Sequence, residues 1–182
     1  WDFGWTWSST TVKELTLSNN KFTNIHGNVL NGNCYYYKFG SITIENNYMN
    51  NIYSNAVYIQ DYYGGIANDI NVNHNTIKNV QYGSMIELYI PHYGGNGVRG
   101  WINFTDNKLD TSVNWGNGVY IYAYNEQMKG VNIERNVVKD IKGWQSFYME
   151  FSSSTFKYDM NINNNTVARC QNGIWMYSYS IN

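Results

Sequence analysis

The chain has 182 residues, of which 43% are hydrophobic and 14% are charged, and its 12 basic and 13 acidic side chains give a net charge of −1. This length allows one elongated core, and because neither charge sign forms a run, we expect no nucleic-acid partner and no binding to an anionic membrane surface. No apolar stretch approaches the roughly twenty residues of a membrane helix, so the sequence predicts no membrane insertion.

Residues 1–14 precede the regular part of the sequence and are rich in tryptophan, with Trp1, Trp5 and Trp7. We interpret this segment as an aromatic N-terminal cap that folds over the first structural unit behind it, because natural proteins usually cover the exposed edge strands of a sheet. The predicted organisation is therefore a cap, residues 1–14, followed by a repetitive body, residues 15–182.

One pattern recurs six times in the body of the chain. Each copy has two apolar residues one position apart and an asparagine five residues after the first of them. The steps between the asparagines are 27, 28, 32, 29 and 29 residues, so the unit is constant while its connections vary in length. Such a period indicates a solenoid. The repeated asparagines are Asn20, Asn47, Asn75, Asn107, Asn136 and Asn165.

The apolar residues of each copy alternate with polar ones, as at Ile70 and Val72, and this pattern predicts a strand with one buried face. Further apolar positions follow, as at Ile77 and Val80. No copy contains an amphipathic helix of about ten residues, which excludes the helical repeat classes. A further strand is expected later in five of the coils, at residues 57–59, 86–88, 119–121, 147–149 and 174–176.

Coils of this length, whose strands meet at asparagine turns, resemble the parallel β-helix repeats of the pectate-lyase superfold. The resemblance implies an all-β fold, a right-handed parallel β-helix (β-solenoid) of about six coils that spans residues 15–182. It implies little about activity, because that superfold hosts lyases, hydrolases, adhesins and phage spikes.

The asparagine column has a mechanical explanation. Asparagine tolerates the left-handed conformation better than most residues, so we expect each repeated asparagine to adopt it where two strands meet. Coils about 4.8 Å apart then allow each amide to bond to the amides above and below. We therefore interpret the column as a structural ladder and not as a ligand site.

The second strand of each coil directs aromatic side chains outward. With 18 Tyr and 7 Trp in the chain, these positions predict an exposed aromatic face along the solenoid. Three interpretations stay open: stacking against sugar rings, packing against another copy, and aromatic residues that merely suit a sheet surface. The candidate interface or glycan-binding residues are Tyr58, Tyr89, Tyr120, Tyr122, Tyr148, Trp175 and Tyr177.

The catalytic motifs of the resembling superfold are missing. Pectate lyases combine a calcium-binding aspartate cluster with an arginine base, and polygalacturonases have an Asn-Thr-Asp segment, an aspartate pair and a Gly-His-Gly segment. The chain has only three arginines, and we place Arg99 in a long connection, residues 89–101. We expect no metal, no cofactor and no catalytic residue.

A weaker catalytic possibility is that carboxylates meet beside the aromatic face, with Glu87 facing Glu150 or Asp61. Cys34 and Cys170 belong to the first and last coils, about 24 Å apart at 4.8 Å per coil. They are therefore too distant for a disulfide with each other, whose Cα atoms lie within about 7 Å.

We hypothesise an extracellular or cell-surface, non-catalytic structural protein of the filament or adhesin type, which assembles through its aromatic face and open coil ends. The strand-like residues 175–182 lack a cap, so we expect self-association or a longer parent solenoid. The alternative is a carbohydrate-active enzyme of the same superfold, a polysaccharide lyase or glycoside hydrolase, or its glycan-binding module. A polysaccharide is the other expected partner.

Overall fold

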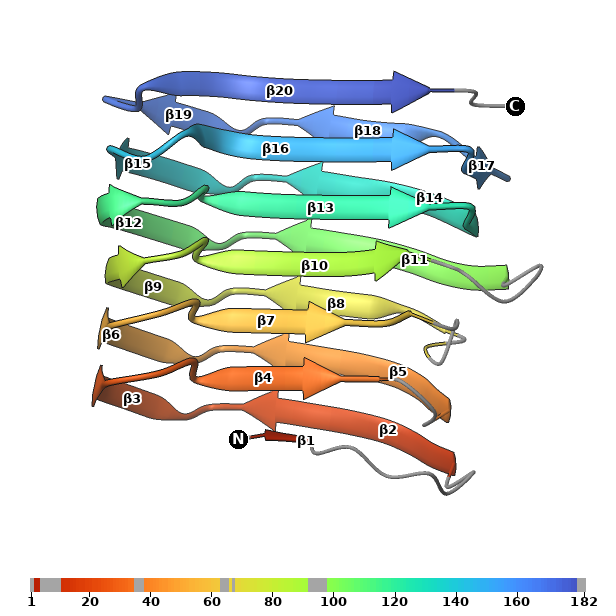
Figure 1. Ribbon diagram of the computed structural model, residues 1–182, viewed down its shortest axis with the longest axis horizontal. Coiled ribbons are helices and arrows are strands. Elements are labelled where there is room, and N and C mark those ends of the chain that lie inside the picture. The colour runs from red at the N-terminus through yellow and green to blue at the C-terminus, as the bar shows by residue number, and fades with distance from the viewer. Residues whose placement is uncertain are drawn as a thin grey trace.

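The computed structural model describes residues 2–3, 11–34, 38–62, 66, 68–91 and 98–179. In these residues the chain forms a parallel β-solenoid of about five turns without a helix (Figure 1). The predicted all-β solenoid is confirmed, and its turn number is close to the six coils expected from the repeat. Each strand pairs in parallel with its counterparts on neighbouring coils, so sequence order is also order along the axis.

Three parallel sheets make up the sides of the solenoid among the described residues. Sheet A contains β1 (Asp2–Phe3), β4 (Leu30–Asn33), β7 (Val57–Gln60), β10 (Ile86–Pro91), β13 (Val119–Tyr124), β16 (Gln145–Ser152) and β20 (Asn172–Tyr179). Sheet B contains β2 (Thr11–Ser18), β5 (Lys38–Glu45), β8 (Ile70–Asn73), β11 (Val98–Thr105), β14 (Gln127–Glu134), β17 (Thr155–Phe156) and β18 (Met160–Asn163). Sheet C contains β3 (Lys21–Ile25), β6 (Tyr48–Ile52), β9 (Thr76–Tyr82), β12 (Lys108–Trp115), β15 (Val137–Ile141) and β19 (Thr166–Ala168).

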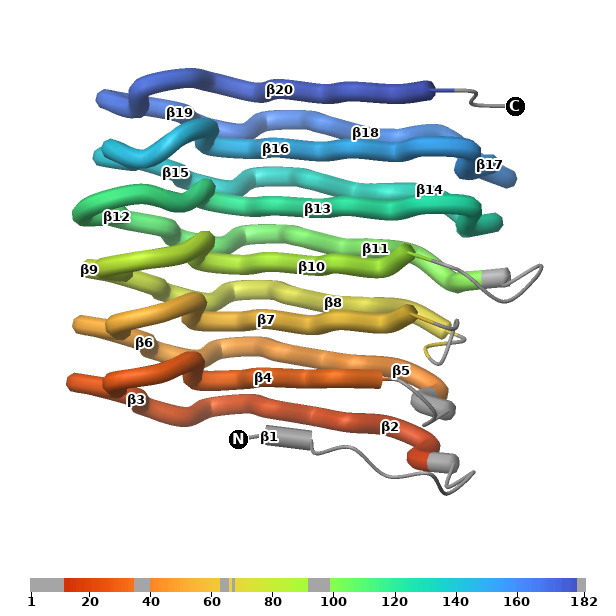
Figure 2. The backbone as a smooth tube through the Cα atoms, viewed as in Figure 1, coloured from red at the N-terminus to blue at the C-terminus, as the bar shows by residue number. Residues whose placement is uncertain are grey.

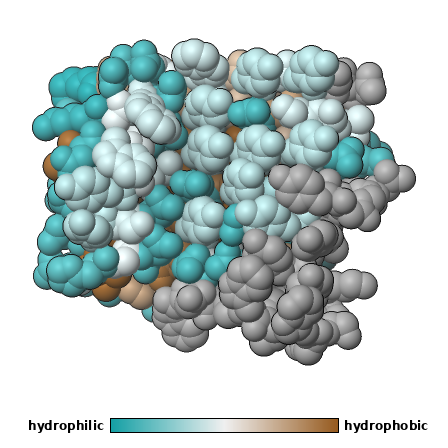
Figure 3. All heavy atoms as spheres, viewed as in Figure 1, coloured by the Kyte–Doolittle hydropathy of each residue, from teal (hydrophilic) through white to brown (hydrophobic). Residues whose placement is uncertain are grey.

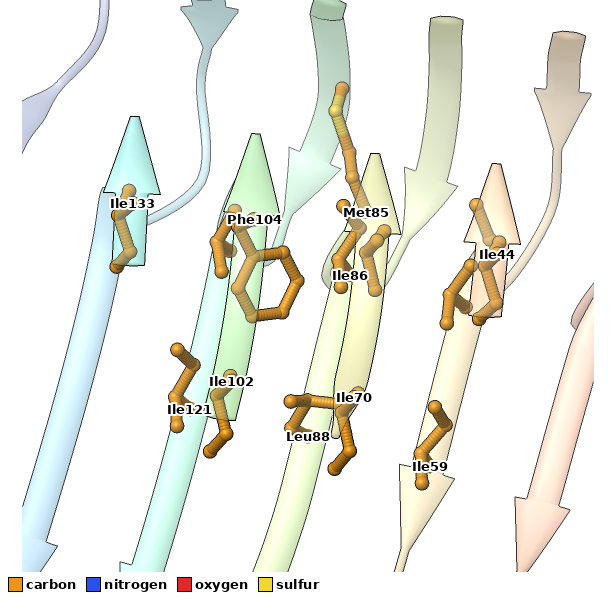
Figure 4. Close-up of a cluster of buried hydrophobic side chains, with 14 of the residues drawn as sticks. Ile44, Ile59, Ile70, Met85, Ile86, Leu88, Ile102, Phe104, Ile121 and Ile133 are labelled. Atoms are coloured by element: carbon orange, nitrogen blue, oxygen red, sulfur yellow. The ribbon is translucent and has the colours of Figure 1, made fainter. Parts of the chain in front are cut away.

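The core is a stack of aliphatic side chains between the sheets. Ile70 and Ile102 from sheet B lie beside Leu88 and Ile121 from sheet A (Figure 4), and all four are completely buried. Ser112 is the polar member of an otherwise apolar column, and it is completely buried. Its burial is tolerated because its hydroxyl accepts a hydrogen bond from the Lys142 backbone amide at 3.1 Å. The period-two pattern of the strands therefore determines which side chains form the core.

The repeated asparagines form a continuous ladder at the turn between sheets B and C. Each Nδ2 donates to Oδ1 of the next asparagine, at distances between 2.9 and 3.1 Å, from Asn20 to Asn165. The four inner members, Asn47, Asn75, Asn107 and Asn136, are buried. In the central coils Nδ2 also donates to a strand carbonyl one coil back, as Asn107 does to Val72 at 2.7 Å.

The expectation that the ladder asparagines themselves are left-handed is wrong. The left-handed residue precedes each of them, because the ladder amide must point inward while the chain reverses one position earlier. At that earlier position the side chain is solvent-accessible, so residues as different as histidine and arginine occur there. The left-handed residues of this column are Asn19, Asn46, His74, Asp106, Arg135 and Asn164, with φ between 56° and 59°.

The two ends of the chain are only partly described. Within the predicted cap, Asp2–Phe3 forms β1 and pairs with β4, whereas residue 1 and residues 4–10 lie outside the described part. Strand β2, which pairs with β5, begins at Thr11. At the other end β20 pairs with β16, and residues 180–182 lie outside the described part.

Arg99 is not in a connection, as the sequence interpretation has it, but inside β11, with its side chain buried. Its Nη2 donates to Asp61 at 3.0 Å and to Glu126 at 2.7 Å. Burial alone lowers the pKa of Arg99, but the carboxylates of Glu126 and Asp61 outweigh it and raise that pKa above its ordinary value. Burial also raises the pKa of the nearby Cys34 thiol, which makes it a poor nucleophile.

Candidate functional site

Outward side chains of sheet A stack from coil to coil. Because the strands are parallel and in register, equivalent positions lie directly above one another. Tyr89 and Tyr122 stack at 4.9 Å between ring centroids, and Tyr120 and Tyr148 stack at 5.2 Å. Tyr148 also stacks on Trp175 at 6.4 Å. We call these residues the strand aromatics, and Figure 3 shows ring-shaped side chains gathered over this face.

A second column of rings lies at the turn between sheets C and A. Successive centroids are 5.1 Å apart for Tyr53 and Tyr82, 6.3 Å for Tyr82 and Trp115, and 6.3 Å for Trp115 and Trp144. We call these four residues the turn aromatics. They were not predicted, although their spacing of 29, 33 and 29 residues repeats with the coils. In Figure 2 the turns that carry them line up along one side of the solenoid.

The space between the two aromatic columns is an open groove of about 590 Å³. Tyr82, Trp115 and Trp144 form one wall, and Tyr58, Tyr62, Tyr89, Tyr120 and Gln60 form the other. The remaining lining residues are small or polar, with one carboxylate among them: Ser54, Asn55, Gly83, Ser84, Glu87, Gly116 and Asn117.

Two glycines keep the floor of the groove low. Gly83 and Gly116 have φ of 113° and 123°, in the region that other residues rarely adopt. A Cβ at Gly83 would collide with the Asn55 side chain, and one at Gly116 would collide with the Gly83 carbonyl. The turns of neighbouring coils therefore pack closely only because side chains are absent there.

Glu87 lies on the floor, in register with Tyr58 on one neighbouring strand and Tyr120 on the other. Partial burial raises the pKa of its carboxyl, and hydrogen bonds from Ser84 and Asn55 offset part of that effect. Burial likewise raises the pKa of the Tyr120 phenol, and Glu150 and Glu87 raise it further. Glu87 is the only charged side chain among the described residues that line the groove.

The structure brings only part of the predicted site together. Tyr58, Tyr89 and Tyr120 line the groove, whereas the other predicted aromatics lie farther along sheet A. Trp175 and Tyr177 are on β20 and are about half exposed. The aromatics outside the groove are Tyr122, Tyr148, Trp175 and Tyr177.

The suggested carboxylate pairs do not form in the groove. Asp61 is completely buried against Arg99, so its predicted meeting with Glu87 beside the aromatic face is wrong. Glu150 is on β16, separated from the Glu87 strand by β13, and accepts a hydrogen bond from the Tyr148 hydroxyl at 3.1 Å. Among its described lining residues the groove thus presents one carboxylate, whereas most glycosidases use two.

In the part of the chain that the structure describes, no three His, Cys, Asp or Glu side chains gather as metal ligands would. The same residues contain no helix that is long and apolar enough to span a membrane.

No family model, no curated protein and no solved structure matches this chain. Its class therefore rests on its own geometry: a parallel β-solenoid with an aromatic-walled groove on one side.

Proposed function

We propose that the chain is an extracellular or cell-surface β-solenoid that binds a polysaccharide in the groove without cleaving it. The carrying observation is that two columns of tyrosine and tryptophan rings face a floor of amides, hydroxyls and one carboxylate. Sugar rings have apolar faces that stack on aromatic rings, and their hydroxyls need hydrogen-bond partners at the edges. The groove offers both kinds of contact.

The direction of the groove suits a chain-like ligand. Its lining residues come from four successive coils, from Tyr58 to Trp144, which span about 14 Å at 4.8 Å per coil. Both aromatic columns follow the solenoid axis. A polysaccharide would therefore lie along that axis, across the strands, with consecutive sugars against consecutive coils.

The absence of cleavage is part of the proposal, and its support is that Glu87 is the single carboxylate among the described residues that line the groove. Hydrolysis of a glycosidic bond usually needs two carboxyl groups that flank the bond. One acts as the general acid, and the other acts as the general base or the nucleophile. We further propose that the solenoid is right-handed and belongs with the pectate-lyase superfold, on the strength of the asparagine-turn repeat. An adhesin or matrix protein of a cell surface would use such a groove to hold glycans.

The test is binding of soluble polysaccharides by isothermal calorimetry and affinity electrophoresis, with Trp115→Ala as the groove variant. Trp175→Ala is a matched control, because Trp115 and Trp175 are 51% and 52% exposed but only Trp115 lines the groove. We expect Trp115→Ala to weaken binding about tenfold or more and Trp175→Ala to leave it unchanged. Release of reducing ends or unsaturated products would instead support the enzyme alternative.

A second candidate function, assembly, is favoured by the last coil. Ile174 and Met176 are in register with the buried Phe147 and Met149, yet they are 49% and 55% exposed. A strand from a second copy that packs against them would bury them. Sedimentation velocity over a range of concentrations tests self-association: a monomer at all concentrations would contradict it.

A further inference from the structure

The groove carries a charge pattern that selects among polysaccharides. None of the described lining residues is basic, and the single charge is the carboxylate of Glu87. The described groups around it add no positive charge: Tyr58 faces it from β7, Tyr120 from β13, and Tyr89 follows on its own strand. Glu150, on the next strand but one, does not line the groove.

A carboxylate in this position affects charged and uncharged sugars in opposite ways. A partly buried negative charge repels another carboxylate strongly, because the surrounding aromatic rings replace water that would screen the two. An uncharged sugar instead offers hydroxyl groups, which can donate charge-assisted hydrogen bonds to the same carboxylate. Asn55, Ser84 and Asn117 can bind further hydroxyls nearby.

The effect is not confined to one sugar. A polysaccharide that lies along the solenoid axis passes Glu87, which has a neighbouring coil on either side. The sugars before and after the one at Glu87 therefore lie within a few coil spacings of its carboxylate. A polyuronate would bring a carboxylate on every unit, and several of these would lie close to Glu87. An uncharged chain meets no such opposition.

We propose that the groove is specific for uncharged polysaccharides and excludes polyuronates, with Glu87 as the residue that sets this selectivity. The inference rests on the proposed glycan-binding function and adds the chemical class of the glycan. It runs against the expectation of uronate substrates that a likeness to pectate lyases would bring.

The experiment compares each uncharged glucan or mannan that binds with its own C6-oxidised derivative, which has the same backbone and a carboxylate at C6. Affinities are measured by calorimetry at neutral pH for the wild type, for Glu87→Gln and for Glu150→Gln. Glu150 is the control, because it lies on the same face but does not line the groove. Thermal unfolding of each variant confirms that it is folded.

We expect the wild type to bind the oxidised polymer at least about tenfold more weakly than the parent polymer, a difference typical of an unfavourable charge contact. Glu87→Gln should remove most of that difference, and Glu150→Gln should not. Equal affinity of the wild type for the two polymers, or an unchanged difference in Glu87→Gln, would overturn the inference and leave the proposed function standing. Binding of polyuronates alone would likewise overturn only the inference. Failure to bind any polysaccharide, charged or uncharged, would overturn both.

Discussion

Two columns of side chains recur once per coil at neighbouring turns of this solenoid, and they differ in almost every physical respect. The asparagine ladder, between sheets B and C, is buried and joins coil to coil through amide hydrogen bonds. The turn aromatics, between sheets C and A, have their rings about half exposed and touch one another only loosely. One column points into the solenoid and the other points out.

This difference shows that a repeat determines where side chains lie but not which function they have. A buried amide must have its hydrogen bonds, so the ladder contributes to stability, and its residue type is nearly fixed. An exposed aromatic ring does not need such hydrogen bonds and can contact a ligand. We therefore expect changes in buried columns to reduce stability and changes in exposed columns to reduce binding.

The largest effect is expected for the buried arginine. Arg99→Ala removes the guanidinium from the buried carboxylates of Asp61 and Glu126, and loss of one partner of a buried ion pair typically costs about 3–5 kcal/mol. Urea denaturation measures the change. Arg135→Ala is the exposed counterpart, since Arg135 pairs with Asp106 and Glu134 at the surface, and it should cost far less stability. Similar losses for the two would break the comparison.

A smaller loss is expected in the ladder itself. Asn107→Ala removes the Oδ1 acceptor of Asn75 and one of the two donors to Asn136 Oδ1, so the free energy of unfolding should fall by about 1–3 kcal/mol. Asn103→Ala is the control, because Asn103 sits in a second, outer ladder and bonds Asn71 and Asn132 while only partly buried. We expect Asn103→Ala to lower the free energy of unfolding by less than about 1 kcal/mol. An unchanged melting temperature for Asn107→Ala would refute the structural role of the ladder.

The smallest expected effect is a slight gain in stability when Glu87, in the groove, is replaced by glutamine. Because the pKa of Glu87 is raised in the folded state, that state binds the proton more tightly than the unfolded chain does. The contribution of the Glu87 carboxyl to the free energy of unfolding is greatest at acidic pH and declines as the pH rises through the raised pKa. Glu87→Gln lacks this decline, so it should be slightly more stable than wild type near about pH 7.5 and similar near about pH 4. A gain of equal size at both values would contradict this.

Much of the fold could be predicted because the repeat is a local pattern. Alternation at Ile70 and Val72, and the asparagine that follows, specify strand, inward face and coil spacing without knowledge of distant contacts. The left-handed position was misplaced by one residue, since the sequence shows which residue recurs but not which way its side chain points. Arg99 was misplaced because its partners are 38 and 27 residues away.

The groove was harder to predict than the face it lies on. Period-two alternation identified Tyr58, Tyr89 and Tyr120 as outward, but a groove needs a second wall. That wall, with Trp115 and Trp144, arises from turns whose lengths vary, so its residues do not align with the strand pattern. The role of Glu87 depends on these rings around it, and single-strand alternation contains no information about them.

The most direct test of the account measures stability and polysaccharide binding together for Trp115→Ala and Asn107→Ala. We predict that Trp115→Ala unfolds within about 1 kcal/mol of wild type and loses binding about tenfold or more, as for an exposed ring that contacts ligand. Asn107→Ala should lose about 1–3 kcal/mol and, at a temperature where it is folded, bind as wild type does. If Trp115→Ala binds like wild type, or if both variants lose stability and binding in parallel, the division between a buried structural column and an exposed binding column is wrong.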